Sequence, residues 1–290
     1  MESKISATTS LYAFIASPAH HSKSPVMHNC AFKELGIDSV YLAFDIKSDK
    51  LKDAINGFKA MGVKGANVSM PHKQNIIPYL DQISTASKLC NAVNTIVLKD
   101  DKYYGTITDG IGLIKSLEEK KWTIENKKIT MVGAGGASTA IMVQMALDGA
   151  KEIVVYNRTI RKEFIEIINN TNKETGCLIT LKSLSDTYNL KQDMQDSYLF
   201  INTTGVGMEP MLNQSVVPDS SYFHSNLKVV DIIYQPAITK MLQMALDAGC
   251  EIMNGELMLL YQGAESFKIW TGLDMPINKV KKVLGIEVKK

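Results

Sequence analysis

The chain has 290 residues, 45% of them hydrophobic and 21% charged, a composition typical of a globular protein long enough for two domains. Its 32 basic and 30 acidic residues leave a net charge of +2, which argues against a nucleic-acid-binding surface. No apolar run approaches the roughly 20 residues that cross a bilayer, and the first residues, MESKISATTS, lack the apolar core of a signal peptide. We therefore expect a soluble, cytoplasmic protein that binds neither nucleic acid nor membrane.

Cysteine and histidine positions predict neither a disulfide framework nor a metal site. Cys30, Cys90, Cys177 and Cys250 lie far apart in the sequence, and no Cys-x-x-Cys pair or Cys/His cluster has the spacing of metal ligands. We expect four reduced, partly buried thiols and no bound metal. The basic C-terminal segment KKVLGIEVKK is expected to be a solvated helix end.

Predicted strands and helices alternate along the first part of the chain. Apolar and alternating runs predict strands at 11–17, 39–46 and 63–69. Helices are expected at 24–36, at 50–62 and, in broken form, at 75–83. Ser24 is a favoured N-cap, Pro25 fits the first helical position and Gly36 ends the first helix. Lys73 closes the stretch NVSMPHK and directly follows its Ser-Met-Pro-His turn, where we expect the strand to have ended and no helix to have begun.

A hairpin interrupts this alternation, and a second series of strands and helices follows it. Residues 93–108 contain two β-rich runs around a polar Lys-Asp-Asp-Lys turn. Further strands are expected at 127–132, 152–157, 197–202 and 228–233. Helices are expected at 110–120, at 236–249 with Pro236 at its start and Gly249 past its end, and at 256–272. The whole pattern predicts an α/β protein with largely parallel sheets covered on both faces.

The stretch KKITMVGAGGASTAIMVQMALDGA combines a predicted strand, a glycine-rich turn and a predicted helix. Glycines let the backbone turn tightly and approach a pyrophosphate, whose charge then lies at the helix N-terminus. The alternative is an ordinary tight turn, because Ala137-Ser138 displaces the usual third glycine. We predict a dinucleotide site at Gly133, Ala134, Gly135, Gly136 and Ala137.

The residues after the second strand of this series bear on the choice of cofactor. NAD sites usually carry an acidic residue there for the ribose hydroxyls, whereas a 2′-phosphate favours a basic residue. This chain has Asn157, Arg158 and Thr159, followed by Arg161, with no carboxylate before Glu163. We therefore favour NADP over NAD. The alternative is that Arg158 is a surface residue at the end of the strand.

A dinucleotide site indicates hydride transfer, and hydride transfer at an alcohol carbon needs a group that carries the proton. Lys73 is the best candidate in the first part of the chain, and Asp109 is placed after the hairpin where it can orient that lysine. The alternative is a solvated surface lysine, which is the commoner situation.

Eight short motifs occur along the chain in a set order: PAHHSKSPVMHN, NVSMPHK, AVNTIV, TDG, GAGGAS, NRT, VDIIYQP and YQGAE. In order and spacing they resemble the shikimate dehydrogenase family, and they are most similar to its quinate/shikimate dehydrogenase branch. The resemblance implies an N-terminal α/β substrate-binding domain with a mixed, mostly parallel sheet (1–110, completed by 255–290) and a Rossmann-type domain (111–254). It also implies NAD(P)-dependent oxidation of shikimate or quinate to the 3-dehydro ketone, in a monomer or homodimer.

The resemblance also implies roles for individual residues. Lys73 and Asp109 match the catalytic pair, and Asn67 is expected to be structural. The positions that match substrate-contacting residues are Ser22, Ser24, Ser69, Asn94, Tyr234 and Gln262. On the cofactor side, Asn202, Thr203 and Gly255 match positions near the nicotinamide and its ribose.

Four positions depart from the family pattern. Ile107 replaces an asparagine, Asn91 and Leu257 each replace a glycine, and Ile160 stands where the quinate branch has an NAD-favouring aspartate. These departures leave two alternatives open: a dehydrogenase for a related ring acid such as an amino analogue, or a nucleotide-binding sensor with little activity.

Overall fold

The computed structural model describes residues 5–20 and 22–286, which divide into two compact units. The first unit comprises the described residues up to Gly112 and from Leu260 on, and the second comprises residues 113–259. His21 and the last four residues of the basic C-terminal segment, to which two of our expectations refer, lie outside the described residues.

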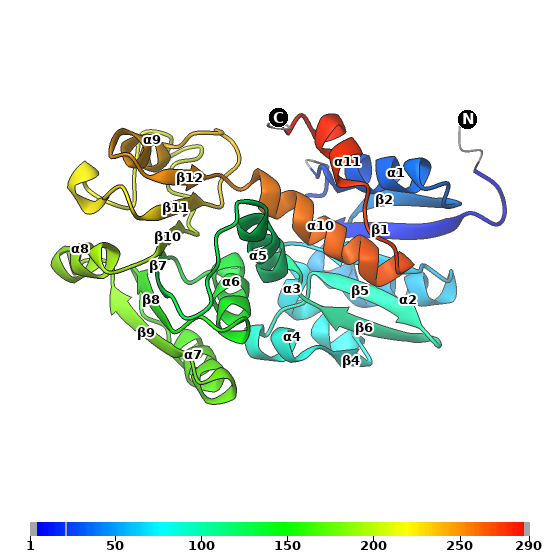
Figure 1. Ribbon diagram of the computed structural model, residues 1–290. Helices are drawn as coiled ribbons and strands as arrows, with labels where there is room; N and C mark the ends of the chain where they lie inside the picture. The colour runs from blue at the N-terminus through cyan, green and yellow to red at the C-terminus, as the bar shows by residue number, and fades with distance from the viewer. Residues whose placement is uncertain (1–4, 21, 287–290) are drawn as a thin grey trace. The chain divides into compact units, whose positions relative to one another are not determined.

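The sheet of the first unit combines parallel and antiparallel strands (Figure 1). Its strands, in the spatial order β2-β1-β3-β5-β6-β4, are β1 (Ser10–Ala16), β2 (Ser39–Asp45), β3 (Gly65–Val68), β4 (Gln82–Ile83), β5 (Thr95–Lys99) and β6 (Lys102–Thr106). β1 is parallel to β2 and β3, and β4 is parallel to β6, whereas β5 is antiparallel to both β3 and β6. The carboxyl ends of β1, β3 and β6 therefore meet the start of β5 at one edge of the sheet, and the predicted mixed sheet is confirmed.

The turn between β5 and β6 has the backbone that a tight hairpin requires. Asp100 and Asp101 both have positive φ angles, of 48° and 56°. Such left-handed pairs match the twist of the two strands, and aspartate tolerates them better than most residues. The hairpin predicted from the polar turn is therefore confirmed.

The helices of the first unit are α1 (Ser24–Glu34), α2 (Leu51–Ala60), α3 (His72–Asn75), α4 (Thr85–Cys90) and α11 (Ile277–Leu284). The expectation that Ser24 is the N-cap of α1 is wrong: Lys23 is the cap residue and Ser24 is the first helical residue. The backbone N–H of Ser24 is instead satisfied by the Ser22 hydroxyl, at 3.2 Å. Two further helices, α5 (Asp109–Glu119) and α10 (Glu256–Thr271), pass along the chain from one unit to the other.

The sheet of the second unit is parallel throughout its described strands. In the order β12-β11-β10-β7-β8-β9 these are β12 (Glu251–Met253), β11 (Lys228–Asp231), β10 (Leu199–Asn202), β7 (Lys128–Val132), β8 (Glu152–Asn157) and β9 (Leu178–Ser183). The order reverses between β7 and β10, as in a doubly wound dinucleotide-binding fold. The predicted Rossmann-type architecture is confirmed.

The helices of this unit are α6 (Gly136–Leu147), α7 (Lys162–Thr175), α8 (Thr187–Gln195) and α9 (Lys240–Asp247). The prediction that α9 begins at Pro236 is wrong. Thr239 caps the helix instead, because its hydroxyl accepts a hydrogen bond from the Leu242 N–H at 3.3 Å. Gly249 follows the helix with a φ of 80°, as expected of a glycine past a helix end.

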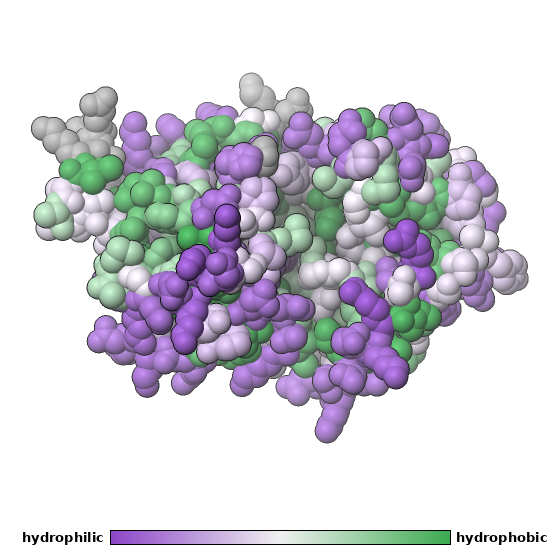
Figure 2. Space-filling model, turned by 180° about the vertical axis from the view of Figure 1, so that it is seen from behind, coloured by the Kyte–Doolittle hydropathy of each residue, from purple (hydrophilic) through white to green (hydrophobic). Residues whose placement is uncertain are grey.

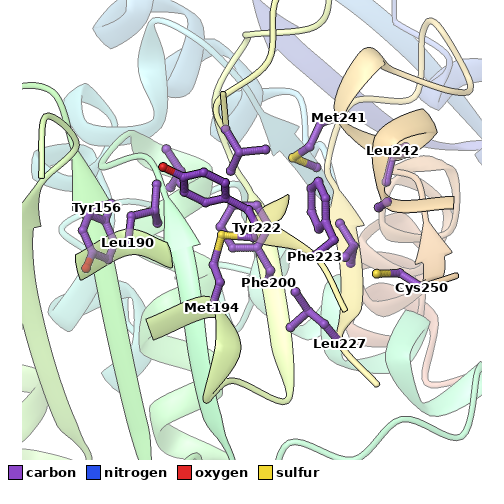
Figure 3. Close-up of a cluster of buried hydrophobic side chains, with 14 of the residues drawn as sticks. Tyr156, Leu190, Met194, Phe200, Tyr222, Phe223, Leu227, Met241, Leu242 and Cys250 are labelled. Carbon is purple, nitrogen blue, oxygen red and sulfur yellow. The ribbon is translucent and has the colours of Figure 1, made fainter. Parts of the chain in front are cut away.

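Large apolar side chains fill the space beneath α8 and α9 in the second unit (Figure 3). Phe200 of β10 and Phe223 meet edge to face, with ring centroids 6.4 Å apart. Leu190 and Met194 of α8 and Leu242 of α9 are fully buried in the same cluster. Burying such side chains contributes about 1.5–3 kcal/mol each, so this core stabilises the packing of β10 and β11 with α8 and α9.

Hydrophilic residues cover much of the face shown in Figure 2, with smaller groups of hydrophobic residues among them. In the part of the chain that the structure describes, no helix has the length and apolar character needed to span a bilayer. None of the four cysteines forms a disulfide.

Candidate active site

Lys73 lies at the sheet edge where the ends of β1, β3 and β6 meet the start of β5. β3 ends at Val68, and the chain then turns into the single helical turn of α3, which contains Lys73. The expectation that Lys73 belongs to no helix is therefore wrong. The Lys73 carbonyl accepts a hydrogen bond from the N–H of Val93 at 2.8 Å, which attaches this turn to the segment leading into β5.

Asp109 reaches the same edge from the end of β6, as the first residue of α5. The Lys73 ammonium donates to Asp109 Oδ2 at 2.6 Å. The lysine side chain is 22% exposed and that of Asp109 only 11%. The structure thus brings together the two residues predicted to be the catalytic pair and leaves the lysine accessible from solvent.

Asn94 holds the carboxylate of this pair in place. Its amide donates to Asp109 Oδ1 at 2.9 Å and to the Thr108 hydroxyl at 3.1 Å. Its carbonyl oxygen accepts from the N–H of Thr108 and from the hydroxyl of Thr95, both at 2.9 Å. Because every polar atom of the Asn94 side chain is engaged, the amide is fixed in the orientation that donates to Asp109.

A buried polar network continues from Asn94 through residues that were not predicted as site residues. Asn67, expected to be structural, donates to the Thr95 and Ser266 hydroxyls and accepts from the phenol of Tyr41 at 2.8 Å. Burial raises the pKa of Tyr41 well above its usual value, so the phenol stays neutral and remains a donor. Polar residues within apolar strand sequences were the available signal, but the sequence does not show that Ser266 meets them.

The predicted substrate residues of the first unit gather at this edge or close to it. Ser22 and Ser24 follow β1, and Ser69 follows β3, its parallel neighbour. Ser24 is buried, whereas Ser22 and Ser69 are partly exposed. Gln262 precedes Ser266 by one turn of α10, and its carbonyl accepts from the Ser266 hydroxyl at 3.0 Å. Tyr234, the other predicted substrate residue, belongs to the second unit.

Two of the departures from the family pattern have a local explanation in the first unit. Asn91 ends α4 with φ 49° and ψ 43°, the left-handed conformation that glycine adopts most easily and asparagine next. The side chain there preserves the backbone that a glycine would provide. Ile107 is buried, at 3% exposure, and has become part of the core.

In the second unit, the glycine-rich turn leads from β7 into α6. Gly133 has a φ of 119°, and a Cβ there would lie 2.4 Å from the Thr203 hydroxyl, so only glycine fits. A Cβ on Gly135 or Gly136 would meet nothing within 4 Å. Space is therefore open beside the backbone at the N-terminus of α6, which is where a pyrophosphate would need to approach.

The segment after β8 is tied to this turn. Arg161 donates from its guanidinium to the Ala134 carbonyl at 2.7 Å, and the Asn157 amide donates to the Thr159 carbonyl at 2.6 Å. Arg158 and Ile160 are exposed. Because β7 and β8 are parallel neighbours, the Arg158 segment and the glycine-rich turn lie at the same edge of the sheet.

A pocket of about 470 Å³ opens at the carboxyl ends of β10 and β11. Its walls are residues 203–205 with 208–209 on one side and residues 232–235 on the other, and these include the predicted Thr203 and Tyr234. Asn202 is fully buried behind the first wall, and its side-chain atoms bond within the protein.

Gly255 and Leu257 lie where the chain enters α10. A Cβ on Gly255 would lie 1.9 Å from the Ile232 carbonyl oxygen, so close packing alone requires glycine at this position. Leu257 is partly exposed in the first turn of α10. Among the residues that the structure describes, no group of three or more His, Cys, Asp or Glu side chains is arranged to hold a metal.

Comparison with known proteins identifies relatives over nearly the whole chain. Three family models match: the shikimate dehydrogenase substrate binding domain at 14–96, shikimate/quinate 5-dehydrogenase at 116–234 and the shikimate 5′-dehydrogenase C-terminal domain at 255–284. The shikimate dehydrogenase (NADP(+)) of Streptococcus pyogenes serotype M28 (strain MGAS6180) is 44% identical over 292 residues, covering 99% of this chain and 100% of that protein.

Solved structures show the same likeness. Shikimate 5-dehydrogenase from Listeria monocytogenes, in complex with shikimate and NAD, is 43% identical with a TM-score of 0.94, over 97% of this chain and 98% of that one. A shikimate dehydrogenase in complex with NADP+ is 35% identical with a TM-score of 0.89, over 99% and 98% of the two chains.

Proposed function

Because the chain belongs to the shikimate dehydrogenase family, we propose that it catalyses the reversible, NADP-dependent oxidation of shikimate to 3-dehydroshikimate. The observation that carries the proposal is the contact of 2.6 Å between Lys73 Nζ and Asp109 Oδ2, with the carboxylate held by Asn94. We assign substrate binding to the first unit and cofactor binding to the second.

Lys73 carries the proton in this mechanism. Lys73 Nζ first releases a proton to solvent, and as the substrate alcohol becomes a ketone the resulting neutral amine accepts the hydroxyl proton and becomes an ammonium again; in the reverse direction the ammonium returns the proton. Asp109 holds Nζ in place with Oδ2, while Asn94 keeps the carboxylate from rotating by donating to Oδ1. When bound, the cofactor supplies the nicotinamide ring that accepts the hydride.

The polar residues around this pair fit a ring that carries hydroxyls and a carboxylate. In our proposal the hydroxyls of Ser22 and Ser24 hold the carboxylate, Ser69 and Gln262 contact the ring hydroxyls, and Asn94 contacts a ring hydroxyl by exchanging its bond to the Thr108 hydroxyl for one to the substrate. Because β1 and β3 are parallel neighbours, the segment that follows β1, with Ser22 and Ser24, and the segment that follows β3, with Ser69, leave the sheet at the same edge. This arrangement supports the division of roles. The family resemblance also assigns Tyr234 to the substrate.

The features of the second unit support a dinucleotide with a 2′-phosphate. The open space at Gly135 and Gly136 suits the pyrophosphate, and the exposed Arg158 suits the 2′-phosphate. The pocket formed by 203–205 and 232–235 is assigned to the nicotinamide end, because β10 and β11 form the other half of the doubly wound sheet. Arg161 fixes the glycine-rich turn, so its assigned role is to shape the site.

Quinate oxidation is a second candidate activity of the same site, since a matching family model covers both acids. The alternative of a dehydrogenase for an amino analogue rests on the departures at Ile107 and Leu257. The alternative of a nucleotide-binding sensor requires a site with little catalytic activity. The intact contact of Lys73 with Asp109 favours the enzyme over the sensor.

Product analysis tests this proposal. Incubation with shikimate and NADP should yield one equivalent of 3-dehydroshikimate for each NADPH formed, measured by absorbance and mass spectrometry. In a thermal-shift assay both shikimate and NADP should stabilise the protein. Stabilisation by the dinucleotide without any by shikimate, and without product, would support the sensor instead.

A further inference from the structure

Asp231 is a fully buried carboxylate at the carboxyl end of β11. Its Oδ1 accepts hydrogen bonds from the amide of Asn202 and from the backbone N–H of Ile233, both at 3.1 Å. Its Oδ2 accepts from the hydroxyl of Thr239 at 2.8 Å. One side chain therefore joins the end of β10, the segment after β11 and the start of α9.

Two of these partners connect Asp231 to the walls of the pocket at the ends of β10 and β11: Ile233 lines the second wall, and Asn202 lies behind the first. Asn202 fixes the first wall, because it accepts from the N–H and hydroxyl of Thr204 at 3.0 and 2.7 Å and donates to the Val206 carbonyl at 3.2 Å. Ile233 lies in the second wall. The two sides also approach each other at Gly207, where a Cβ would lie 3.2 Å from the Thr239 side chain.

The carboxylate is kept in this position at a cost to stability. Within residues 5–20 and 22–286, no lysine or arginine forms an ion pair with Asp231. Burial raises the pKa of Asp231 to about 6, although its three hydrogen bonds act in the opposite direction. Ionisation at neutral pH therefore opposes folding, which is unexpected for a residue that serves the fold alone.

We infer that Asp231 is a positioning residue for the nicotinamide end of the cofactor, because it joins both walls of the pocket assigned to that end. The inference rests on the proposed function. Three donors converge on the carboxylate, whereas an asparagine amide offers one acceptor oxygen and turns an NH2 group towards at least one of them. Replacing Asp231 with asparagine should therefore release one wall while keeping the shape of the side chain.

Asp193 provides a matched control in the same unit. It is also buried and also has three side-chain partners, namely the ammonium groups of Lys128 and Lys182 and the phenol of Tyr156. It lies on α8 rather than at the pocket. Asp193→Asn removes a buried carboxylate of the same size without touching either wall.

The experiment measures, for wild type, Asp231→Asn and Asp193→Asn, the Kd of NADPH from its fluorescence and the Tm at pH 8. Asp231→Asn should bind NADPH roughly tenfold more weakly, as for the loss of about one buried hydrogen bond, with a Tm at or above that of wild type. Its affinity for adenosine 2′,5′-bisphosphate, which has no nicotinamide, should not change. Asp193→Asn should lower the Tm and leave the NADPH Kd as in wild type.

Two results overturn the inference: an unchanged NADPH Kd in Asp231→Asn, or an equal weakening of NADPH and adenosine 2′,5′-bisphosphate. Thr239→Val, which removes one partner and keeps the carboxylate, is the second probe if Asp231→Asn does not fold. It should show the same selective loss, and an unchanged NADPH Kd in it counts against the inference. Failure of wild type to bind NADPH contradicts the proposed cofactor instead, and so identifies which of the two ideas has failed.

Discussion

Lysine and aspartate side chains meet in two regions of this chain at nearly the same distance but in different surroundings. In the first unit, Lys73 Nζ lies 2.6 Å from Asp109. In the second, Lys128 and Lys182 lie 2.8 and 2.7 Å from the two oxygens of Asp193. Lys128 is at the amino end of β7, the end opposite the glycine-rich turn, whereas Lys73 is at the carboxyl end of β3.

The two aspartates differ in their neighbours. The phenol of Tyr156 adds a third donor to Asp193 at 2.6 Å, so that carboxylate is surrounded by groups that hold it. Asp109 Oδ1 accepts a hydrogen bond from the neutral amide of Asn94, and Oδ2 accepts one from Lys73. A short ion pair does not by itself indicate an active site, and neither does exposure, because the side chain of Lys182 is 37% exposed and that of Lys73 is 22% exposed. The two regions differ in position, and the place of Lys73 at the sheet edge beside the predicted substrate residues supports its proposed role.

Replacing Lys73 should have the largest effect on activity. Lys73→Met keeps the alkyl stem and removes the proton carrier, so kcat for shikimate should fall about 10²–10⁴-fold, with KM changed only a few-fold. Steady-state kinetics on protein of measured Tm checks this, with Lys182→Met as the matched control that keeps wild-type kcat. A kcat within about threefold of wild type would contradict the role of Lys73.

Asp193→Asn should have the opposite profile. It should lower the free energy of unfolding at pH 7 by about 1–3 kcal/mol and leave kcat unchanged. Burial raises the pKa of Asp193, but the bonds from Lys128, Lys182 and Tyr156 outweigh it and bring the pKa below its usual value. Because the folded pKa is the lower one, this stability is present above the pKa of the unfolded chain and is lost as the pH falls through the folded pKa.

Urea unfolding of wild type and Asp193→Asn at a series of pH values tests that sign. The two stabilities should converge on acidification. A difference that stays constant or grows at low pH would show that the Asp193 charge does not stabilise the fold.

Arg158→Ala should change the KM of NADP and no other kinetic constant. Loss of one charge-assisted contact to a 2′-phosphate should raise the KM of NADP about tenfold, while the KM of NAD stays the same. Lys162→Ala, another exposed cation four residues further on, is the control. An equal rise of both KM values would remove Arg158 from the assignment of NADP.

Asn91→Gly should have the smallest effect. The left-handed backbone at this position suits glycine, so stability should change by less than about 1 kcal/mol and kcat should stay the same. A changed substrate preference in Asn91→Gly would mean that the asparagine side chain, and not only its backbone, acts in the site.

The sequence predicted the elements whose signals are local. The glycine-rich turn with its flanking strand and helix is one example, and the Lys-Asp-Asp-Lys hairpin is another, because each depends on a few adjacent residues. β9 was not predicted: its residues are mostly half exposed at the sheet edge, and it lacks a continuous apolar run. The start of α9 was misplaced because Pro236 gave a stronger local signal than the cap residue Thr239.

The candidate site was predictable only in part, for a related reason. The resemblance to a known family indicated Lys73 and Asp109, and the structure brings them together. The contact of Asn67 with Ser266 joins residues 199 positions apart, which no local pattern reveals. The roles of the substrate and cofactor residues, the oligomeric state and the cytoplasmic location stay predictions.

The most direct test of the central claim is kcat/KM of the wild-type protein for shikimate and for quinate, each with NADP and with NAD. We predict the highest value for shikimate with NADP. A higher value for quinate or for NAD, or no turnover in any of the four pairings by protein with a cooperative unfolding transition, would contradict the assignment.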